Sequence, residues 1–192
     1  MKWIVLIILL IIGPYTFLRW HYRKPQNAFE PYHDIKDRAN TIRLLSAGFQ
    51  RITLTADRPA EPLRNVPAIA TNSIAGGLPS SLASTLVDKP LLATKILSIT
   101  TPGESNTLLA YTIEFTCAVS DNRQELSNVH LYLRDGEIFL VPQFDRLNGE
   151  LLSRNRENLV RVTIPAGTLK PGAYDVALIG EQSSRSWSLV VK

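Results

Sequence analysis

Apolar and polar residues alternate along the second half of the chain, which is the pattern of strands with one buried face. Residues 91–100, 129–134, 137–141, 158–164, 173–180 and 187–192 all have strand character. The clearest run places an apolar side chain at every second position: Leu109, Tyr111, Ile113, Phe115, Cys117 and Val119. Residues 91–192 are therefore predicted to fold as about seven strands, the rhythm of a β-sandwich.

A β-hairpin is the strongest local signal. Asp135-Gly136 separates two apolar-rich segments and supplies the positive φ angles that a two-residue turn requires. The turn fixes the cross-strand pairs, which are expected to be Arg134 with Glu137, Leu133 with Ile138, Tyr132 with Phe139, and Leu131 with Leu140.

The two faces of this hairpin differ, and one of them is the candidate functional surface. The inward face is expected to carry Leu131, Leu133, Ile138 and Leu140. The other carries His130, Tyr132, Phe139 and Val141, with Arg134 and Glu137 near the turn. An aromatic patch on a monomer's sheet is unusual, so the first four of these are the candidate interaction surface. The alternative is that the helix of residues 32–47 or the proline-rich segment covers them.

A second motif lies between residues 169 and 174. Leu169, Pro171, Gly172 and Tyr174 resemble the tyrosine corner of immunoglobulin-like and fibronectin-like sandwiches, in which a tyrosine hydrogen-bonds back across the preceding loop. Residues 164–180 also resemble the ending of immunoglobulin-like modules on bacterial single-pass membrane proteins, including some membrane anti-sigma factors. The zinc-binding His and Cys motif of those factors is missing here, so an anti-sigma role is not implied.

The region before the sandwich is predicted to hold one helix and one strand. Ile35, Ala39, Ile42 and Leu45 recur at helical spacing over residues 32–47, and Gly48 is expected to end the helix. The plainest interpretation packs this stripe on the protein's own domain. The alternative is a helix that lies on a bilayer or on a neighbouring subunit. Residues 49–56 alternate and are predicted to form a strand.

Residues 57–90 have the composition of a semi-stiff linker. They hold five prolines and the pair Gly76-Gly77. Leu78, Leu82 and Leu86 form a helical stripe inside this segment. A short helix docked on the domain is the favoured interpretation, and a partner-binding helix is the alternative.

The first residues are predicted to be a membrane anchor. Residues 3–18 carry no charge, and as a helix they span roughly 24 Å, short of a bilayer's roughly 30 Å hydrocarbon core. Lys2, Arg19, Trp20, Tyr22, Arg23 and Lys24 flank the run and suit the membrane interface. A cleaved signal peptide is the alternative, but no small-residue cleavage site follows.

Charge bears on orientation and on partners. Residues 1–60 hold 9 basic and 4 acidic side chains, whereas residues 61–192 hold 12 and 13. The positive-inside rule would keep the domain in the cytoplasm, while short amino-terminal anchors and β-rich modules favour export. We expect an extracytoplasmic, periplasmic domain on the inner membrane. The basic part adjoins the anchor and suits anionic headgroups, so nucleic acid is not an expected partner.

Motifs for chemistry are scarce. The chain of 192 residues has one cysteine and three histidines, and it lacks a phosphate-binding glycine loop, a nucleophile elbow and paired metal-ligand spacings. Cys117 is expected to be a core residue. We expect no catalytic residues, no cofactor, no metal and no small-molecule substrate.

These patterns predict a mainly β protein with one N-terminal transmembrane helix, a short amphipathic helix and a C-terminal immunoglobulin-like sandwich. The expected divisions are residues 1–24, 25–56, 57–90 and 91–192. The expected function is that of a non-enzymatic, membrane-anchored interaction protein, an accessory or assembly subunit of a membrane complex. The alternative is a stand-alone cell-envelope domain that binds a glycan or a peptide on the His130, Tyr132 and Phe139 face.

Overall fold

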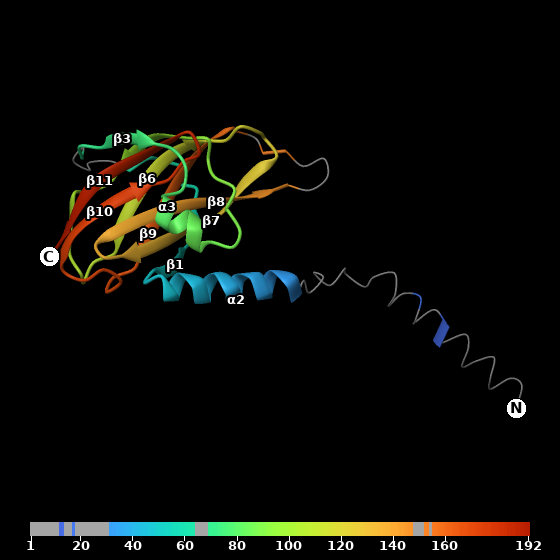
Figure 1. The fold of residues 1–192 in the computed structure, drawn as a ribbon. Coiled ribbons are helices and arrows are strands. Elements are labelled where there is room, and N and C mark those ends of the chain that lie inside the picture. Colours follow the sequence, from blue (N-terminus) through green and yellow to red (C-terminus); the bar gives the residue numbers. More distant parts are fainter. Residues whose placement is uncertain (1–11, 14–16, 18–30, 64–68, 148–151, 154) are drawn as a thin grey trace, which may run out of the picture. The chain divides into compact units, whose positions relative to one another are not determined.

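The computed structural model describes residues 12–13, 17, 31–63, 69–147, 152–153 and 155–192 (Figure 1). The chain divides into two compact units, residues 1–35 and 36–192, and nearly everything below belongs to the second. Within the described ranges, no helix has the length and apolar character needed to cross a membrane. The six predicted interface residues and most of the apolar run lie outside those ranges, so the anchor stays a prediction.

The described secondary structure is mainly β. The two longer helical segments are α2 (Pro31–Ser46) and α3 (Ser80–Thr85). The strands are β1 (Gln50–Leu54), β2 (Ala56–Asp57), β3 (Asn72–Ala75), β4 (Lys95–Thr100), β5 (Glu104–Ser105), β6 (Tyr111–Ala118), β7 (Gln124–Arg134), β8 (Glu137–Arg146), β9 (Glu157–Ile164), β10 (Gly172–Leu178) and β11 (Ser183–Val191).

The strands form one hydrogen-bonded path in the order β1-β7-β8-β10-β11-β4-β6-β9-β2, with β3 and β5 added against β11. The link between β11 and β4 is a single residue pair, Ser183 with Lys95, so the path is weakest there. Most neighbours are antiparallel, but β10 runs parallel to β8. This mainly β arrangement is compatible with a β-sandwich.

The main core follows the alternation that the sequence predicts. Side chains from both halves of the strand path are buried together, including Phe115, Val162, Leu131 and Trp187. Leu109 departs from the predicted pattern and is exposed, because β6 begins only at Tyr111. The Leu109 amide instead bonds the Asn106 carbonyl in the preceding turn at 3.0 Å.

The β7–β8 hairpin has the predicted register at all four pairs. Asp135 and Gly136 take φ angles of 49° and 84°, the left-handed conformation that this turn needs. At the other predicted motif, the Tyr174 hydroxyl donates a 2.9 Å hydrogen bond to the Lys170 carbonyl. Leu169 is buried in the main core beside it.

The β-structure extends beyond residues 91–192. β1 pairs with β7, β2 pairs with β9, and β3 pairs with β11, so segments on the amino-terminal side of residue 91 contribute strands to the same sheet. The predicted short helix is present as α3, and its Leu82 and Leu86 are buried against the domain as the favoured interpretation requires. The proline-rich segment therefore covers the sheet along part of its length.

A buried carboxylate fixes the start of the proline-rich segment. Glu114 lies on the face of β6 that the alternation predicts to be polar, yet it is only 3 % exposed. Its Oε2 accepts hydrogen bonds from Arg161 Nη2 at 2.8 Å and Nε at 3.1 Å, and its Oε1 accepts one from the Leu63 amide at 3.0 Å. Arg161 also donates to the Glu61 carbonyl at 2.9 Å, which ties residues 61–63 to the sheet.

Replacing Arg161 with alanine should lower the free energy of unfolding by about 3 kcal/mol, because Glu114 would be left buried without its cation. Arg58→Ala is the matched control, since the Arg58–Glu125 pair is about half exposed on both sides. That change should cost less than about 1 kcal/mol. Urea unfolding of both variants measures the difference. Equal losses would contradict the role given to Glu114.

Candidate interaction surface

The predicted surface residues lie together, but other parts of the chain cover them. Tyr132 pairs with Phe139, and His130 with Val141, across β7 and β8. Tyr132, Phe139 and Val141 are buried in a second hydrophobic cluster rather than on the outside. His130 is half-buried at its edge. The alternative weighed from the sequence, that the helix and the proline-rich segment cover this face, describes the structure.

Two helices supply the cover. Leu44 and Phe49 come from the end of α2 and the residues after it, while Leu82 and Leu86 come from α3 and its C-cap. Figure 1 shows α3 lying over β7 and β8. Because burying one such side chain contributes about 1.5–3 kcal/mol, this second cluster is a large part of what holds both helices.

The end of α2 is shaped to deliver Phe49 to the sheet. Gly48 has φ of 80°, and the Phe49 amide donates to the Leu44 carbonyl at 2.8 Å, which closes the helix as a Schellman motif. The Phe49 ring then meets the Phe139 ring at a centroid distance of 6.4 Å. The guanidinium carbon of Arg134 lies over the Phe49 ring, 4.3 Å from its centroid.

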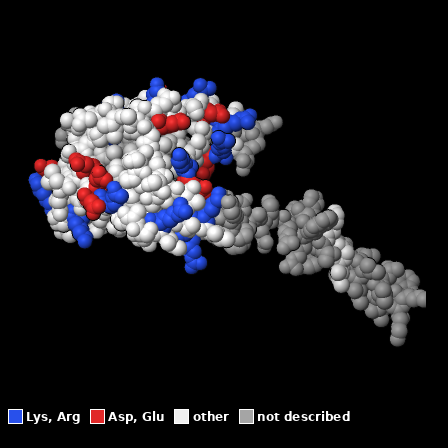
Figure 2. Space-filling view, in the orientation of Figure 1, with Lys and Arg blue, Asp and Glu red and all other residues white. Residues whose placement is uncertain are grey.

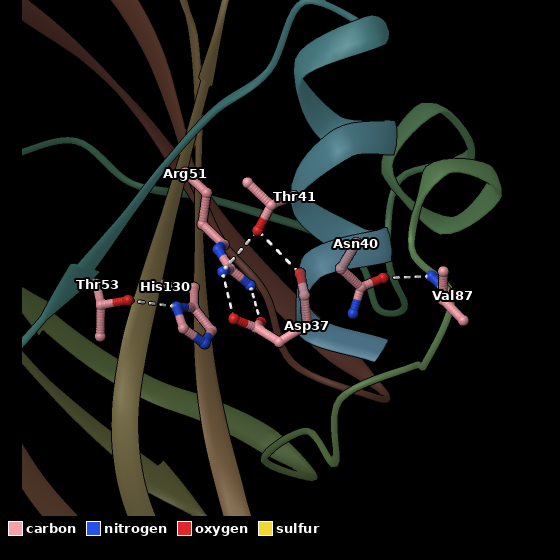
Figure 3. Close-up of polar contacts among 7 residues, drawn as sticks. All are labelled: Asp37, Asn40, Thr41, Arg51, Thr53, Val87 and His130. Carbon is pink, nitrogen blue, oxygen red and sulfur yellow. Dashed lines mark hydrogen bonds and ion pairs between the residues drawn. The ribbon is translucent and has the colours of Figure 1, made fainter. Parts of the chain in front are cut away.

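An ion pair joins α2 to the sheet (Figure 3). Arg51 on β1 donates from Nη1 to Asp37 Oδ1 at 2.7 Å and from Nη2 to Oδ2 at 3.1 Å, a bidentate arrangement. Arg51 Nη2 also donates to Thr41 Oγ1 at 3.2 Å, one helical turn further along. The Arg51 hydrogen bonds hold the pKa of Asp37 below its usual range.

A second set of contacts holds the other flank of the helix. The Val87 amide donates to Asn40 Oδ1 at 2.6 Å, and Lys36 Nζ lies 2.9 Å from Asp88 Oδ2. Both partners belong to the segment just after α3. Figure 3 shows Arg51 and Val87 meeting α2 from two directions. We call the Asp37–Arg51 and Asn40–Val87 contacts the polar clasp.

The polar clasp holds α2 with the opposite face toward the sheet from the one that the sequence predicts. The docked side carries Asp37, Asn40, Thr41 and Leu44, at the i, i+3, i+4 and i+7 spacing of one helix face. The predicted inward stripe is outside instead: Ile35, Ile42 and Leu45 are 65 %, 62 % and 65 % exposed. Helical spacing identifies an apolar face, but it does not reveal that polar bonds and a single leucine fix the opposite one.

Basic residues accompany the exposed stripe. Arg38 and Arg43 are exposed on α2, and neither forms an ion pair with a described residue. Figure 2 shows Lys and Arg side chains gathered along α2. We call Arg38, Ile42 and Leu45, together with Arg43 on their flank, the outer face of α2. It replaces the covered hairpin face as the candidate interaction surface.

Two other groups bear on chemistry. Cys117 is fully buried, and burial raises the pKa of its thiol to about 12, so it is a core residue without nucleophilic character. Among the described residues, no cluster of three His, Cys, Asp or Glu side chains could hold a metal ion.

A hollow of about 300 Å³ beside α3 is lined mainly by apolar residues, with Lys89 and Glu181 as its charged members.

The docked and outer sides of α2 give a direct test at neighbouring positions. Leu44→Ala should lower the free energy of unfolding by about 2–5 kcal/mol, because Leu44 is fully buried in the second cluster. Leu45→Ala removes the same atoms from an exposed site and should change it by less than about 0.5 kcal/mol. Thermal and urea unfolding measure both. A larger loss for Leu45→Ala would mean that the helix docks through its apolar stripe.

His130 should make stability depend on pH. Burial first, and then the nearby Arg51 cation, lower the pKa of His130, while hydrogen bonding to Gln143 and the Asp37 carboxylate act in the other direction. Thr53 Oγ1 lies 3.2 Å from its Nδ1, and the Tyr132 ring lies beside it. The unfolded chain therefore binds a proton at higher pH than the folded chain, and stability falls as pH drops below about 6.5.

His130→Gln should reduce this loss, which is measured as the shift of the urea midpoint between pH 7.5 and pH 5. Asp37 contributes separately: its lowered pKa adds stability above the unfolded value, which is lost as pH falls through the folded value. The two groups therefore act in different pH ranges. An unchanged midpoint shift in His130→Gln would show that other groups cause the pH dependence.

Comparison with protein-family models, with curated proteins and with solved structures gave no match to this chain. Its function therefore has to be inferred from its own residues. Those residues provide a β-rich domain, a covered aromatic face and a helix whose apolar stripe is held outward by the polar clasp.

Proposed function

We propose that this protein is a non-enzymatic, membrane-anchored interaction protein, an accessory or assembly subunit of a membrane complex. In this proposal residues 3–18 anchor the chain in the inner membrane, and the β-rich domain lies on the periplasmic side. The single observation that carries it is the outer face of α2. Ile42 and Leu45 stay exposed there although the same helix buries Leu44.

Exposed isoleucine and leucine side chains on one helix face are an expected feature of a surface that contacts either a protein or a membrane. The polar clasp supports this interpretation, because it stabilises α2 without using those side chains. A helix that served only its own domain would gain more from burying Ile42 and Leu45 than from exposing them.

The fold supports a module of the immunoglobulin-like class. The Tyr174 hydroxyl bonds the Lys170 carbonyl as in a tyrosine corner, and strands from both halves of the path contribute side chains to one core. Such a module is a scaffold on which many functions occur, so the class supports a binding role only together with the outer face of α2.

No catalytic role is part of the proposal. The shifted pKa values of Asp37, Arg51, His130 and Tyr132 belong to one packed junction between α2, β1 and β7. The causes of these shifts are burial, the Asp37–Arg51 ion pair and a hydrogen bond between His130 and Gln143, all of which belong to the packing of the helix on the sheet. These groups therefore have a sufficient structural explanation.

The alternative function, a stand-alone envelope domain that binds a glycan or a peptide, now has a weaker basis. It relied on an exposed His130, Tyr132 and Phe139 face, and α2 and α3 cover that face. The hollow beside α3 is the remaining place for such a ligand, and its lining is mainly aliphatic. Aliphatic walls lack the aromatic platform that the glycan hypothesis invoked.

Two measurements on the tagged full-length chain test the proposed function. Membranes washed with alkaline carbonate should retain the protein, because an apolar span resists extraction whereas peripheral contacts do not. Purification in mild detergent should then yield a membrane protein in near-stoichiometric amount. Release by carbonate would contradict the anchor, and a solitary purified protein would contradict the role as a subunit.

A further inference from the structure

We propose that the outer face of α2 binds the surface of a bilayer that contains anionic lipid. The apolar side chains Ile42 and Leu45 would enter the boundary between headgroups and acyl chains, and Arg38 and Arg43 would contact lipid phosphates. This inference rests on the proposed membrane location and names anionic lipid as the partner of the domain at that location.

The spacing of these side chains fits an interfacial helix. Arg38, Ile42 and Leu45 stand at i, i+4 and i+7 on one side of α2, whereas Arg43 lies about 100° from Ile42 around the helix axis, on the flank of that side. An arginine in this position can lay its methylene groups along the apolar stripe while its guanidinium reaches a phosphate. The combination of apolar side chains with flanking cations is the pattern of helices that lie in the membrane plane.

The charges on α2 favour lipid over an undefined apolar partner. α2 has two acidic residues, Asp34 near its start and Asp37, and Arg51 binds the Asp37 carboxylate on the docked side. The exposed Arg38 and Arg43 therefore set two positive charges against the one negative charge of Asp34. Lys36 is directed to Asp88 and is not counted among them.

The chain before α2 supports the same occupant. Twelve residues, numbers 19–30, separate the predicted anchor from Pro31, and they include Arg19, Arg23 and Lys24. Juxtamembrane cations of this kind are drawn to anionic headgroups at about 1 kcal/mol each. The outer face of α2 continues this basic segment in the sequence.

The polar clasp gives the surface a defined orientation. Contacts from β1 on one flank and from the segment after α3 on the other restrain rotation of α2 about its axis. A free amphipathic peptide must order itself when it binds, whereas this helix is already folded with its apolar stripe turned outward. The domain would therefore meet the membrane in one preferred orientation.

The test uses a fluorescent probe on the full-length chain in lipid nanodiscs with or without phosphatidylglycerol. Ser46→Cys, four residues after Ile42 on the same side of the helix, is labelled with an environment-sensitive maleimide dye. Cys117 is fully buried with a thiol pKa of about 12, so the introduced cysteine is labelled selectively at neutral pH. Leu108→Cys is the matched control, because Leu108 is also highly exposed on the same domain.

In anionic nanodiscs the probe at residue 46 should shift its emission to the blue and be quenched by spin-labelled lipid, while the probe at residue 108 should do neither. Ile42→Asn with Leu45→Asn should abolish the shift without changing the melting temperature, since both side chains are exposed. Arg38→Gln or Arg43→Gln should each lower the ratio of docked to undocked helix about fivefold. Arg146→Gln, an exposed arginine on β8, should leave it unchanged.

A probe at residue 46 that behaves like the probe at residue 108 in anionic nanodiscs would overturn the inference. So would protection of residue 46 that needs a co-purified protein and ignores lipid charge, because the face would then bind a protein. If carbonate releases the chain, the anchor hypothesis is rejected. Flotation of the released chain with phosphatidylglycerol vesicles then tests lipid binding by the outer face of α2 separately from the anchor. Flotation that the double asparagine variant abolishes would uphold it, and absence of flotation would overturn it.

Discussion

The bidentate pair between Asp37 and Arg51 is the contact on which the arrangement of the rest depends. It fixes which side of α2 meets the sheet, and that choice delivers Leu44 and Phe49 to the aromatic residues of β7 and β8. The pair alone is a partly exposed interaction of modest strength. Its importance is directional, because the buried cluster supplies the free energy while the pair and the Asn40–Val87 bond select the rotation of the helix.

Features encoded by neighbouring residues were predictable from the sequence. Asp135-Gly136 specified the hairpin and its register, and the helix, its end at Gly48 and the short docked helix also matched their patterns. Contacts between distant segments were not predictable. No neighbouring residue indicates that Arg51 pairs with Asp37. Nor does one indicate that the buried Glu114 carboxylate accepts hydrogen bonds from Arg161 and the Leu63 amide. An i, i+3, i+4, i+7 series of Asp37, Asn40, Thr41 and Leu44 looks like a solvated face until its partners are known.

The covered hairpin face and the exposed apolar stripe have one cause, which is that α2 docks on the sheet through the face opposite to the predicted one. Periodicity alone assigns Ile42 and Leu45 to the inside and leaves Tyr132 and Phe139 outside. The structure reverses both assignments, since α2 covers the aromatic patch with its docked side and exposes its aliphatic one. The candidate interaction surface is therefore on the helix α2 and not on β7 and β8, and its apolar side chains are aliphatic rather than aromatic.

The pairing of β1 with β7 also has a consequence for the order of folding. Gln50 pairs with Leu133 and Leu54 with Val129, so the first long strand after α2 has no partner until a strand far downstream exists. Contacts between such distant segments form late, because closing long loops is entropically costly. During synthesis Leu44 and Phe49 would remain uncovered while most of the domain is still being made. The docked side of α2 thus acquires its partners only when β7 and β8 have been made, and the second hydrophobic cluster is completed near the end of folding.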